Sequence, residues 1–278
     1  DTNTAPSIDS LSDQTVVTGE NVVVPVSASD AEGDSLTLSK SSGPTFVTLT
    51  DNGDGTGPLE IAPASADEGT YTVEVTADDG SATSTESFQL TVDTATATTS
   101  GTVIDRVNAG ETTTVQATDG GPDWTGVDSA STDGPLVSLS DGNTASGATC
   151  SGDEITPASE VPSSTPDAVY DCEQYGTMTW EFDVTSGSEV EVRLYMGNSF
   201  TGADTDGDRQ YNVGIEGQQV LTEYDPVKDV GDDTGTVKAF TVAEDGDGTV
   251  TITFDPGAAE NPEVRAIEIV ETSSGGSS

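Results

Sequence analysis

The side chains that could carry chemistry are carboxylates and a few aromatic rings, because the chain contains no histidine. Histidine-based catalytic triads and histidine-ligated zinc sites are therefore excluded. A pair of carboxylates could hydrolyse a glycosidic bond, but no pair stands out among the 51 acidic residues. We therefore expect that the protein is not an enzyme.

Acidic residues in the first third of the chain offer oxygen ligands of the kind that calcium prefers. Asp30, Glu32 and Asp34 alternate along the chain, and Asp78 and Asp79 end a strand-like segment. Calcium takes about six to eight oxygen ligands, many of them carboxylates. These five residues form a candidate calcium site, although chance clustering in so acidic a chain explains the pattern as well. We expect no required cofactor.

A second acidic stretch, Asp204-Thr205-Asp206-Gly207-Asp208, resembles the start of an EF-hand loop. It lacks the later glycine and the bidentate glutamate that complete such a loop. The stretch therefore predicts a solvated loop or hairpin, with calcium as the weaker alternative.

Cys150 and Cys172 are the only two cysteines of the chain. Their spacing is not that of a redox motif, and two thiols without histidine make a poor zinc site. A disulfide between them would close a loop of about 22 residues and stabilise the fold by roughly 3 kcal/mol. We expect a structural disulfide, of the kind found in oxidising extracellular surroundings.

The net charge of -44 is spread along the whole chain. Residues 1–93 hold 17 acidic side chains and one basic side chain, which leaves 34 and 6 for the remainder. Such a surface repels itself at low salt and is screened within about 3 Å at molar salt, so we expect adaptation to high salt. Nucleic-acid partners are excluded because phosphate contacts need clustered Lys or Arg. Membrane insertion is excluded because the chain has no run of eighteen apolar residues.

Apolar and polar residues alternate in several short segments of residues 1–93, such as Val22–Ala28 and Tyr71–Ala77. This period of two predicts antiparallel strands with one buried face. Turn signals separate the segments, as in Asp78-Asp79-Gly80. The order of short motifs resembles bacterial and archaeal cadherin-like or Ig-like surface modules: Ala5-Pro6, Gly19-Glu20, Ala28–Leu36, Gly69–Tyr71 and Ala77–Gly80. The resemblance implies a β-sandwich that acts as a spacer or adhesion unit.

The second part of the chain carries a longer series of motifs over about 165 residues. In order, they are Arg106–Gly110, Tyr170–Gly176, Met178–Val184, Val190–Tyr195, Asn198–Phe200, Arg209–Leu221, Tyr224-Asp225, Thr249–Phe254 and Glu260–Ile269. This ordered series resembles malectin domains, which are jelly-roll-like β-sandwiches that bind sugars through loops at one end. The strands Val190–Tyr195, Thr249–Phe254 and Val264–Ile269 also alternate as strands with one buried face do.

The resemblance implies a sugar site built from loop aromatics, an acid and an amide. The matching positions here are Tyr170, Tyr175, Ser199, Phe200, Glu260 and Asn261, and Trp124 is a further loop aromatic. Aromatic faces pack against sugar C–H groups, and polar side chains hydrogen-bond the hydroxyls. Ser199 replaces one member of an aromatic pair and Glu260 stands in place of Asp, so the resemblance alone does not fix the sugar. The expected partners are glucose-containing oligosaccharides or other surface glycans. The alternative is that the aromatics only close the end of the sandwich.

These observations predict an all-β chain with two β-sandwich domains. The predicted boundaries are 1–93 for the Ig-like domain, 94–100 for a Thr-rich linker, 101–271 for the malectin-like domain and 272–278 for a Ser/Gly tail. The predicted function is non-catalytic glycan binding outside the cell or at its surface. The alternative is a structural subunit of a surface filament, surface layer or adhesion stalk, which would self-associate or bind neighbouring surface proteins through exposed strand edges.

Overall fold

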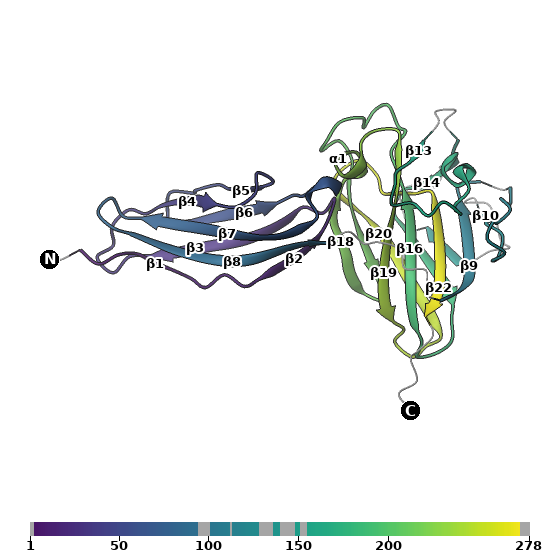
Figure 1. Cartoon of the computed structure of the whole chain (residues 1–278), viewed down its shortest axis with the longest axis horizontal. Coiled ribbons are helices and arrows are strands. Elements are labelled where there is room, and N and C mark those ends of the chain that lie inside the picture. The colour runs from purple at the N-terminus through teal and green to yellow at the C-terminus, as the bar shows by residue number, and fades with distance from the viewer. Residues whose placement is uncertain are drawn as a thin grey trace. The chain divides into compact units, whose positions relative to one another are not determined.

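The computed structural model describes residues 3–93, 101–111, 113–127, 136–139, 148–150 and 155–272. The chain divides into two compact units, Asp1–Thr94 and Ala95–Ser278, named units 1 and 2 below (Figure 1). The predicted linker 94–100 lies outside the described residues, as does the predicted tail after residue 272. No helix of the described residues is long and apolar enough to cross a membrane.

Unit 1 consists of two four-stranded sheets, ordered β1-β3-β6-β5 and β2-β8-β7-β4. The strands are β1 (Ser7–Ile8), β2 (Gln14–Val17), β3 (Val22–Ser29), β4 (Thr37–Ser42), β5 (Val47–Leu49), β6 (Thr56–Ile61), β7 (Gly69–Asp78) and β8 (Thr83–Asp93), with a 3-10 turn at Ser65–Asp67. All pairings are antiparallel except that of β2 with β8.

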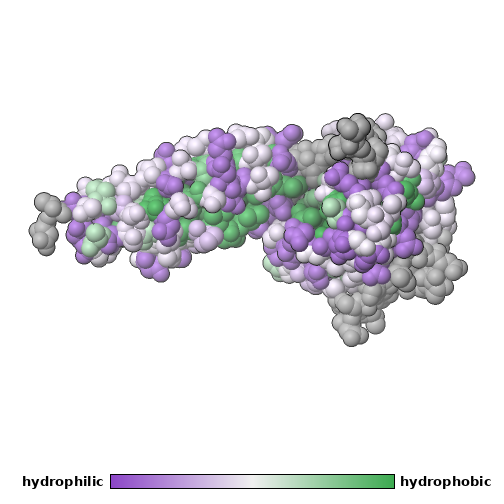
Figure 2. Space-filling view, turned by 90° about the horizontal axis from the view of Figure 1, so that it is seen from below, coloured by the Kyte–Doolittle hydropathy of each residue, from purple (hydrophilic) through white to green (hydrophobic). Residues whose placement is uncertain are grey.

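The core of unit 1 is apolar and follows directly from the alternation of its strands. In β7, Val73, Val75 and Ala77 are buried while the residues between them are at least partly exposed. Such side chains pack with Leu90 of the same sheet and with Leu59 of the other sheet. Figure 2 shows hydrophobic residues (green) along unit 1 among hydrophilic ones (purple); Val23 is 54% exposed.

Unit 2 contains a six-stranded, a five-stranded and a three-stranded sheet. The six-stranded sheet has the order β10 (Thr125–Val127), β9 (Thr102–Ala109), β22 (Ala266–Thr272), β16 (Glu189–Met196), β19 (Thr234–Ala243) and β13 (Thr156–Pro157). The five-stranded sheet has the order β11 (Leu136–Leu139), β15 (Met178–Asp183), β20 (Thr249–Ala259), β17 (Gln210–Ile215) and β18 (Gln218–Tyr224). The three-stranded sheet has the order β12 (Ala148–Thr149), β14 (Glu173–Tyr175) and β21 (Glu263–Val264).

In the described residues of unit 2, helical structure is limited to two short pieces, and the prediction of an all-β chain is confirmed. They are a 3-10 turn at Asp167–Tyr170 and α1 (Pro226–Val230). Asp225 precedes α1 and accepts hydrogen bonds from the backbone N–H groups of Val227 and Lys228. This is the N-cap arrangement that satisfies free amides at a helix start, and it is followed by proline at the first helical position.

The strands of unit 2 differ in how many faces they bury. In β20, buried Val250, Ile252 and Phe254 alternate with partly exposed threonines, as predicted. The prediction of one buried face is wrong for β16, in which every residue after Glu189 is buried. Described residues of the segment between β9 and β14 pack on the outer face of β16 at Tyr195. The Arg193 side chain of β16 is buried in ion pairs with Glu191 and Glu268.

The described residues of that covering segment form a third layer. Trp124, Ile155 and Val169 pack with Tyr195 and Val237 of the six-stranded sheet in a small apolar cluster. Val115 and Trp124 form an isolated antiparallel bridge within the segment. Unit 2 therefore has a second, smaller core on the outside of its six-stranded sheet.

Candidate functional site

The three-stranded sheet brings predicted site residues of unit 2 together. Tyr175 of β14 pairs directly with Glu263 of β21, so the two side chains lie on the same face of the sheet. Glu173 lies on that face as well, because side chains two apart in a strand point the same way. Glu173 and Glu263 are buried, whereas Tyr175 is only partly buried.

Two arginines form ion pairs with the two glutamates that share a sheet face with Tyr175. The Arg265 guanidinium lies 2.9 Å from Glu173 Oε2 and 3.4 Å from Glu263 Oε2. Arg209 Nη1 lies 3.4 Å from Glu173 Oε2. We call Glu173, Glu263, Arg209 and Arg265 the four-charge cluster. Burial raises the pKa of Glu263, and the charge of Arg265 opposes that rise.

Arg265 also fixes the loop that carries the predicted Ser199 and Phe200. Its Nε donates to the carbonyl oxygen of Gly197 at 2.9 Å, and its Nη2 donates to Ser199 Oγ at 2.9 Å. A third hydrogen bond of 3.1 Å runs from Nη1 to the carbonyl oxygen of Tyr170. Ser199 therefore holds the loop through Arg265 and is itself buried.

Phe200 is the exposed aromatic ring of this region. Its side chain is 46% exposed, and the Arg209 guanidinium carbon lies 5.8 Å from the ring centroid. A Cβ on Gly202 would lie only 2.6 Å from two ring atoms, so the ring rests on this glycine and would have to shift if a side chain were added. We call Phe200, seated on Gly202 and Arg209, the Phe200 platform.

Glu260 and Asn261 lie in the turn between β20 and β21, at the same end of unit 2 as Tyr175. The carbonyl oxygen of Pro262 accepts a hydrogen bond of 2.9 Å from Gly176 N–H, which joins this turn to the end of β14. Glu260 has a left-handed backbone, with φ of 53°, and its side chain is exposed. An exposed carboxylate and a partly exposed amide therefore stand beside Tyr175.

Tyr170 and Trp124 are closed to solvent and present no ring face for a ligand. Tyr170 is 1% exposed, and its hydroxyl donates to the carbonyl oxygen of Thr236 at 2.9 Å. Trp124 is 1% exposed and packs edge-on against Tyr195 at 5.1 Å between ring centroids. Both rings belong to the small core of the third layer, and we leave them out of the site.

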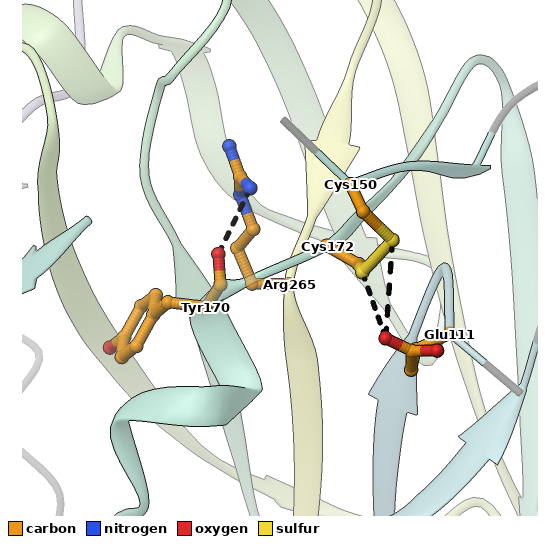
Figure 3. Close-up of a disulfide and its surroundings, with 5 residues drawn as sticks. All are labelled: Glu111, Cys150, Tyr170, Cys172 and Arg265. Atoms are coloured by element: carbon orange, nitrogen blue, oxygen red, sulfur yellow. Dashed lines mark hydrogen bonds between the residues drawn. A yellow bond between two sulfur atoms is a disulfide. The ribbon is translucent and has the colours of Figure 1, made fainter. Parts of the chain in front are cut away.

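The disulfide between Cys150 and Cys172 is present, as predicted. Cys172 directly precedes Glu173, so the bond holds the start of β14 and with it the position of the four-charge cluster. Figure 3 shows that the Tyr170 ring points away from the disulfide while its carbonyl oxygen faces Arg265. Glu111 Oε2 lies 3.1 Å from the Cys172 sulfur.

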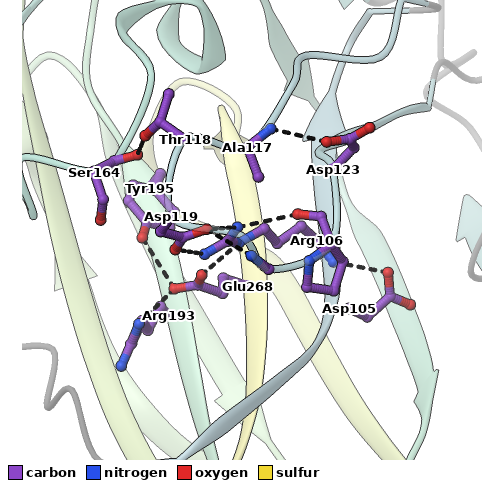
Figure 4. Close-up of polar contacts among 12 residues, drawn as sticks. Asp105, Arg106, Ala117, Thr118, Asp119, Asp123, Ser164, Arg193, Tyr195 and Glu268 are labelled. Atoms are coloured by element: carbon purple, nitrogen blue, oxygen red, sulfur yellow. Dashed lines mark hydrogen bonds and ion pairs between the residues drawn. The ribbon is translucent and has the colours of Figure 1, made fainter.

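A further network of buried charges lies on the outer face of the six-stranded sheet (Figure 4). Glu268 accepts from Arg106 Nε at 2.6 Å and from Arg193 Nη1 at 2.7 Å. Arg106 also contacts Asp119 of the third layer at 2.5 Å, and this hydrogen-bonded pairing holds the pKa of Asp119 well below its ordinary value. The network ties the third layer to the sheet.

Reasoning from sequence missed both buried networks, because charged residues in alternating strands were assigned to exposed faces. A signal for them existed. All four arginines of a chain with 51 acidic residues stand in strands or beside a strand of unit 2. Four arginines that all stand in or beside strands of a very acidic chain indicate buried pairing with carboxylates. The aromatic residues Trp180, Phe182, Tyr211 and Phe254 are buried in the core of unit 2.

The predicted calcium ligands of unit 1 hold turns in place. Asp30 Oδ1 accepts hydrogen bonds from the backbone N–H groups of Glu32 and Asp34, and Asp78 Oδ1 accepts from Gly80 N–H. Glu32 contacts Thr4, and Asp79 contacts Asn3 and residues of its own turn. Within the described part of the chain, no group of three or more potential metal ligands includes any of the five residues. The carboxylates therefore fit turn formation better than a calcium cage.

Comparison with known proteins supports the fold of each part. Residues 5–93 match the family described as "Putative Ig domain", and no curated protein matches the chain. The extracellular domain of ANXUR1 from Arabidopsis thaliana has a TM-score of 0.50 at 12% identity, over 97% of this chain and 82% of that one. The predicted fold class, two β-sandwich domains of Ig-like and malectin-like type, is confirmed.

Two other solved structures are less similar to this chain. The plant receptor-like kinase FER has a TM-score of 0.48 at 15% identity, over 97% of this chain and 81% of that chain. Beta-glucuronidase of Bacteroides uniformis has a TM-score of 0.42 at 13% identity over 94% of this chain. This chain spans 29% of the length of that enzyme.

Proposed function

We propose that unit 2 binds glycans outside the cell or at its surface, at the end that carries the Phe200 platform. The observation that supports this most directly is the exposed ring of Phe200 in unit 2, fixed from behind by Arg209 and Gly202. A rigid aromatic face suits the C–H face of a sugar ring, because little conformational freedom is lost on binding.

Polar groups for the sugar hydroxyls lie at the same end. Tyr175 offers a second aromatic ring with a hydroxyl, and the turn after β20 offers the Glu260 carboxylate and the Asn261 amide. Sugar sites combine a few such polar groups with apolar surface. Binding is non-covalent in this proposal, requires no cofactor and involves no catalysis, and the Ig-like unit serves as a spacer.

The test is a glycan array followed by calorimetry on the full chain in molar salt. Phe200→Ala is expected to weaken binding at least tenfold, because stacking on the ring is lost. Val23→Ala removes an exposed hydrophobic side chain of similar accessibility in unit 1 and is the matched control, expected to leave affinity unchanged. Equal affinity of wild-type protein and Phe200→Ala would contradict the proposal.

The alternative, a structural subunit of a filament or surface layer, has a separate test. Sedimentation over a range of protein and salt concentrations should show a monomer if glycan binding is the function. Concentration-dependent assembly together with an empty glycan array would instead support the structural role.

We also propose that the protein works at high salt. All four arginines and Lys238 are buried, so the surface has almost no cations to pair with its carboxylates. The melting temperature is expected to rise from about 0.1 M to molar KCl as carboxylate repulsion is screened. A melting temperature independent of salt would contradict this.

A further inference from the structure

We propose that the Phe200 platform prefers glycans that carry positively charged amino groups and excludes glycans that carry uronic acids. This inference rests on the proposed glycan-binding function and specifies the chemical class of its ligand. It follows from where unit 2 places its cations, from the carboxylates in the segments next to Phe200 and from an unpartnered acceptor on Asn198, whose amide bonds the Phe200 backbone.

The cations of unit 2 do not contribute positive charge to the site. Arg106, Arg193, Arg209 and Arg265 are each at most 7% exposed, and each contacts at least one carboxylate. Lys238 is also buried, with Nζ 2.6 Å from Asp229. Lys228, on α1, is the remaining cation and is half-buried. Arg209 lies beneath the Phe200 ring and pairs with Glu173. Both residues belong to the four-charge cluster, in which two arginines face two glutamates.

Carboxylates surround the platform on two sides. The loop from Phe200 to Arg209 is closed by the contact between those two side chains. It carries three exposed aspartates, Asp204, Asp206 and Asp208.

On the other side, the Asn198 amide donates both to Asp232 Oδ1 at 2.8 Å and to the carbonyl oxygen of Phe200 at 3.3 Å. Because one amide donates to both, the Asp232 carboxylate lies next to the backbone of Phe200. A ligand on the ring would therefore meet negative groups first.

The side chain that bonds the Phe200 backbone also has an acceptor that lacks a donor. Asn198 is fully buried, and its Oδ1 accepts no hydrogen bond from any described residue. A buried acceptor without a donor is costly unless a ligand or water supplies one. An ammonium group has three donors and no acceptor, and an aromatic face attracts cations. Amino sugars combine that group with the apolar ring face that Phe200 requires.

The experiment compares three short β-linked oligosaccharides by calorimetry with the full chain at pH 6. They are an oligomer of glucosamine, its N-acetylated counterpart and an oligomer of glucuronic acid. At about 0.2 M KCl, the glucosamine oligomer is expected to bind at least tenfold more tightly than the acetylated one, and the glucuronate should show no binding. At about 3 M KCl the preference should shrink to a few-fold, because charges are then screened within about 3 Å.

Two variants separate this inference from the proposed function. The triple variant Asp204→Asn, Asp206→Asn and Asp208→Asn should reduce the preference for glucosamine while keeping the affinity for the acetylated oligomer. The matched control, Asp51→Asn, Asp54→Asn and Asp79→Asn in turns of unit 1, removes the same charge elsewhere and should leave the preference unchanged.

Phe200→Ala should weaken binding of both oligomers at least tenfold. If it does so but the wild-type protein shows no preference for the amino form, only the ligand class is wrong. If Phe200→Ala binds glucosamine as tightly as the wild-type protein, or if neither oligomer binds, the inference is overturned and the site with it. Tighter binding of glucuronate than of the neutral oligomer would overturn the ligand class directly.

Discussion

The two units of this chain handle charge in opposite ways. The buried polar residues described in unit 1 are Thr18 and Glu20, and its core is otherwise apolar. In unit 2 the described residues include eight ion-pair contacts, most of them between side chains that are almost fully buried. Both units share the same acidic character on the outside, so the difference concerns only the interior.

That difference fits the proposed roles of unit 1 as a spacer and of unit 2 as the unit with a ligand-binding end. An apolar sandwich is sufficient for a spacer, because buried charges cost desolvation free energy without adding stability over apolar packing. In unit 2 the four-charge cluster orients the loop of Ser199 and Phe200 through Arg265 and supports the ring through Arg209. Buried charge is found where loops must be held in one conformation.

The largest expected effect comes from removing the central arginine of that cluster. Arg265→Met should lower the free energy of unfolding of unit 2 by about 3–5 kcal/mol, because Glu173 and Glu263 would remain buried with less compensation. Both tryptophans, Trp124 and Trp180, lie in unit 2, so tryptophan fluorescence in urea reports on that unit. Lys228→Met, at a half-buried cation of the same unit, is the control and should change little.

In unit 1 the sensitive residues should be apolar. Leu59 is fully buried in its core, and Leu59→Ala should lower the stability of unit 1 by about 2–5 kcal/mol through lost packing and a cavity. Calorimetry should show one shifted transition, while the tryptophan signal of unit 2 keeps its midpoint. A shift of both transitions together would show that the units unfold as one.

The disulfide gives a third comparison, because only unit 2 contains one. Replacing Cys150 and Cys172 together by serine should lower the stability of unit 2 by about 3 kcal/mol, since the open loop gains entropy in the unfolded chain. The same variant should weaken glycan binding, because β14 begins at Glu173. Unchanged glycan affinity in the folded variant would show that the third layer positions β14 without the bond.

The smallest expected effect is on the stability of unit 2 at acidic pH. The Asp119 pKa is lowered by its hydrogen bonds to Arg106, so this pair contributes stability that is fully present above the unfolded pKa of 3.8 and is lost as the pH falls below it. Because Asp119 is partly exposed, the contribution is about 1–2 kcal/mol. Asp119→Asn should remove that part of the acid dependence of unit 2, as measured by tryptophan fluorescence between about pH 5 and pH 2.

The fold could be predicted from sequence wherever alternation corresponds to one buried face. The strands that contain Val73 and Phe254 follow that rule. The rule fails for β16, because a third layer covers its outer face and the sequence does not show which segment returns to cover a strand. Glu191 and Arg193 therefore look like exposed residues although both are buried.

The candidate site was predictable only in part. The resemblance pointed to Phe200, Tyr175 and Glu260, which the structure places at one end of unit 2. It also pointed to Tyr170, whose ring turns into the third layer because its hydroxyl reaches Thr236. The supporting Arg209 lies nine positions after Phe200, and only the closure of the intervening loop brings the two together.

The position of β22 also determines when unit 2 can fold. This strand, Ala266–Thr272, lies in the middle of the six-stranded sheet, between β9, the first strand of the unit, and β16. Synthesis must therefore reach residue 272 before β9 and β16 have their common neighbour. Unit 1, complete by residue 93, needs no later strand for its own sheets. During synthesis the first unit can therefore be folded while the second is still an open chain, which leaves the second unit exposed to proteases and chaperones for longer.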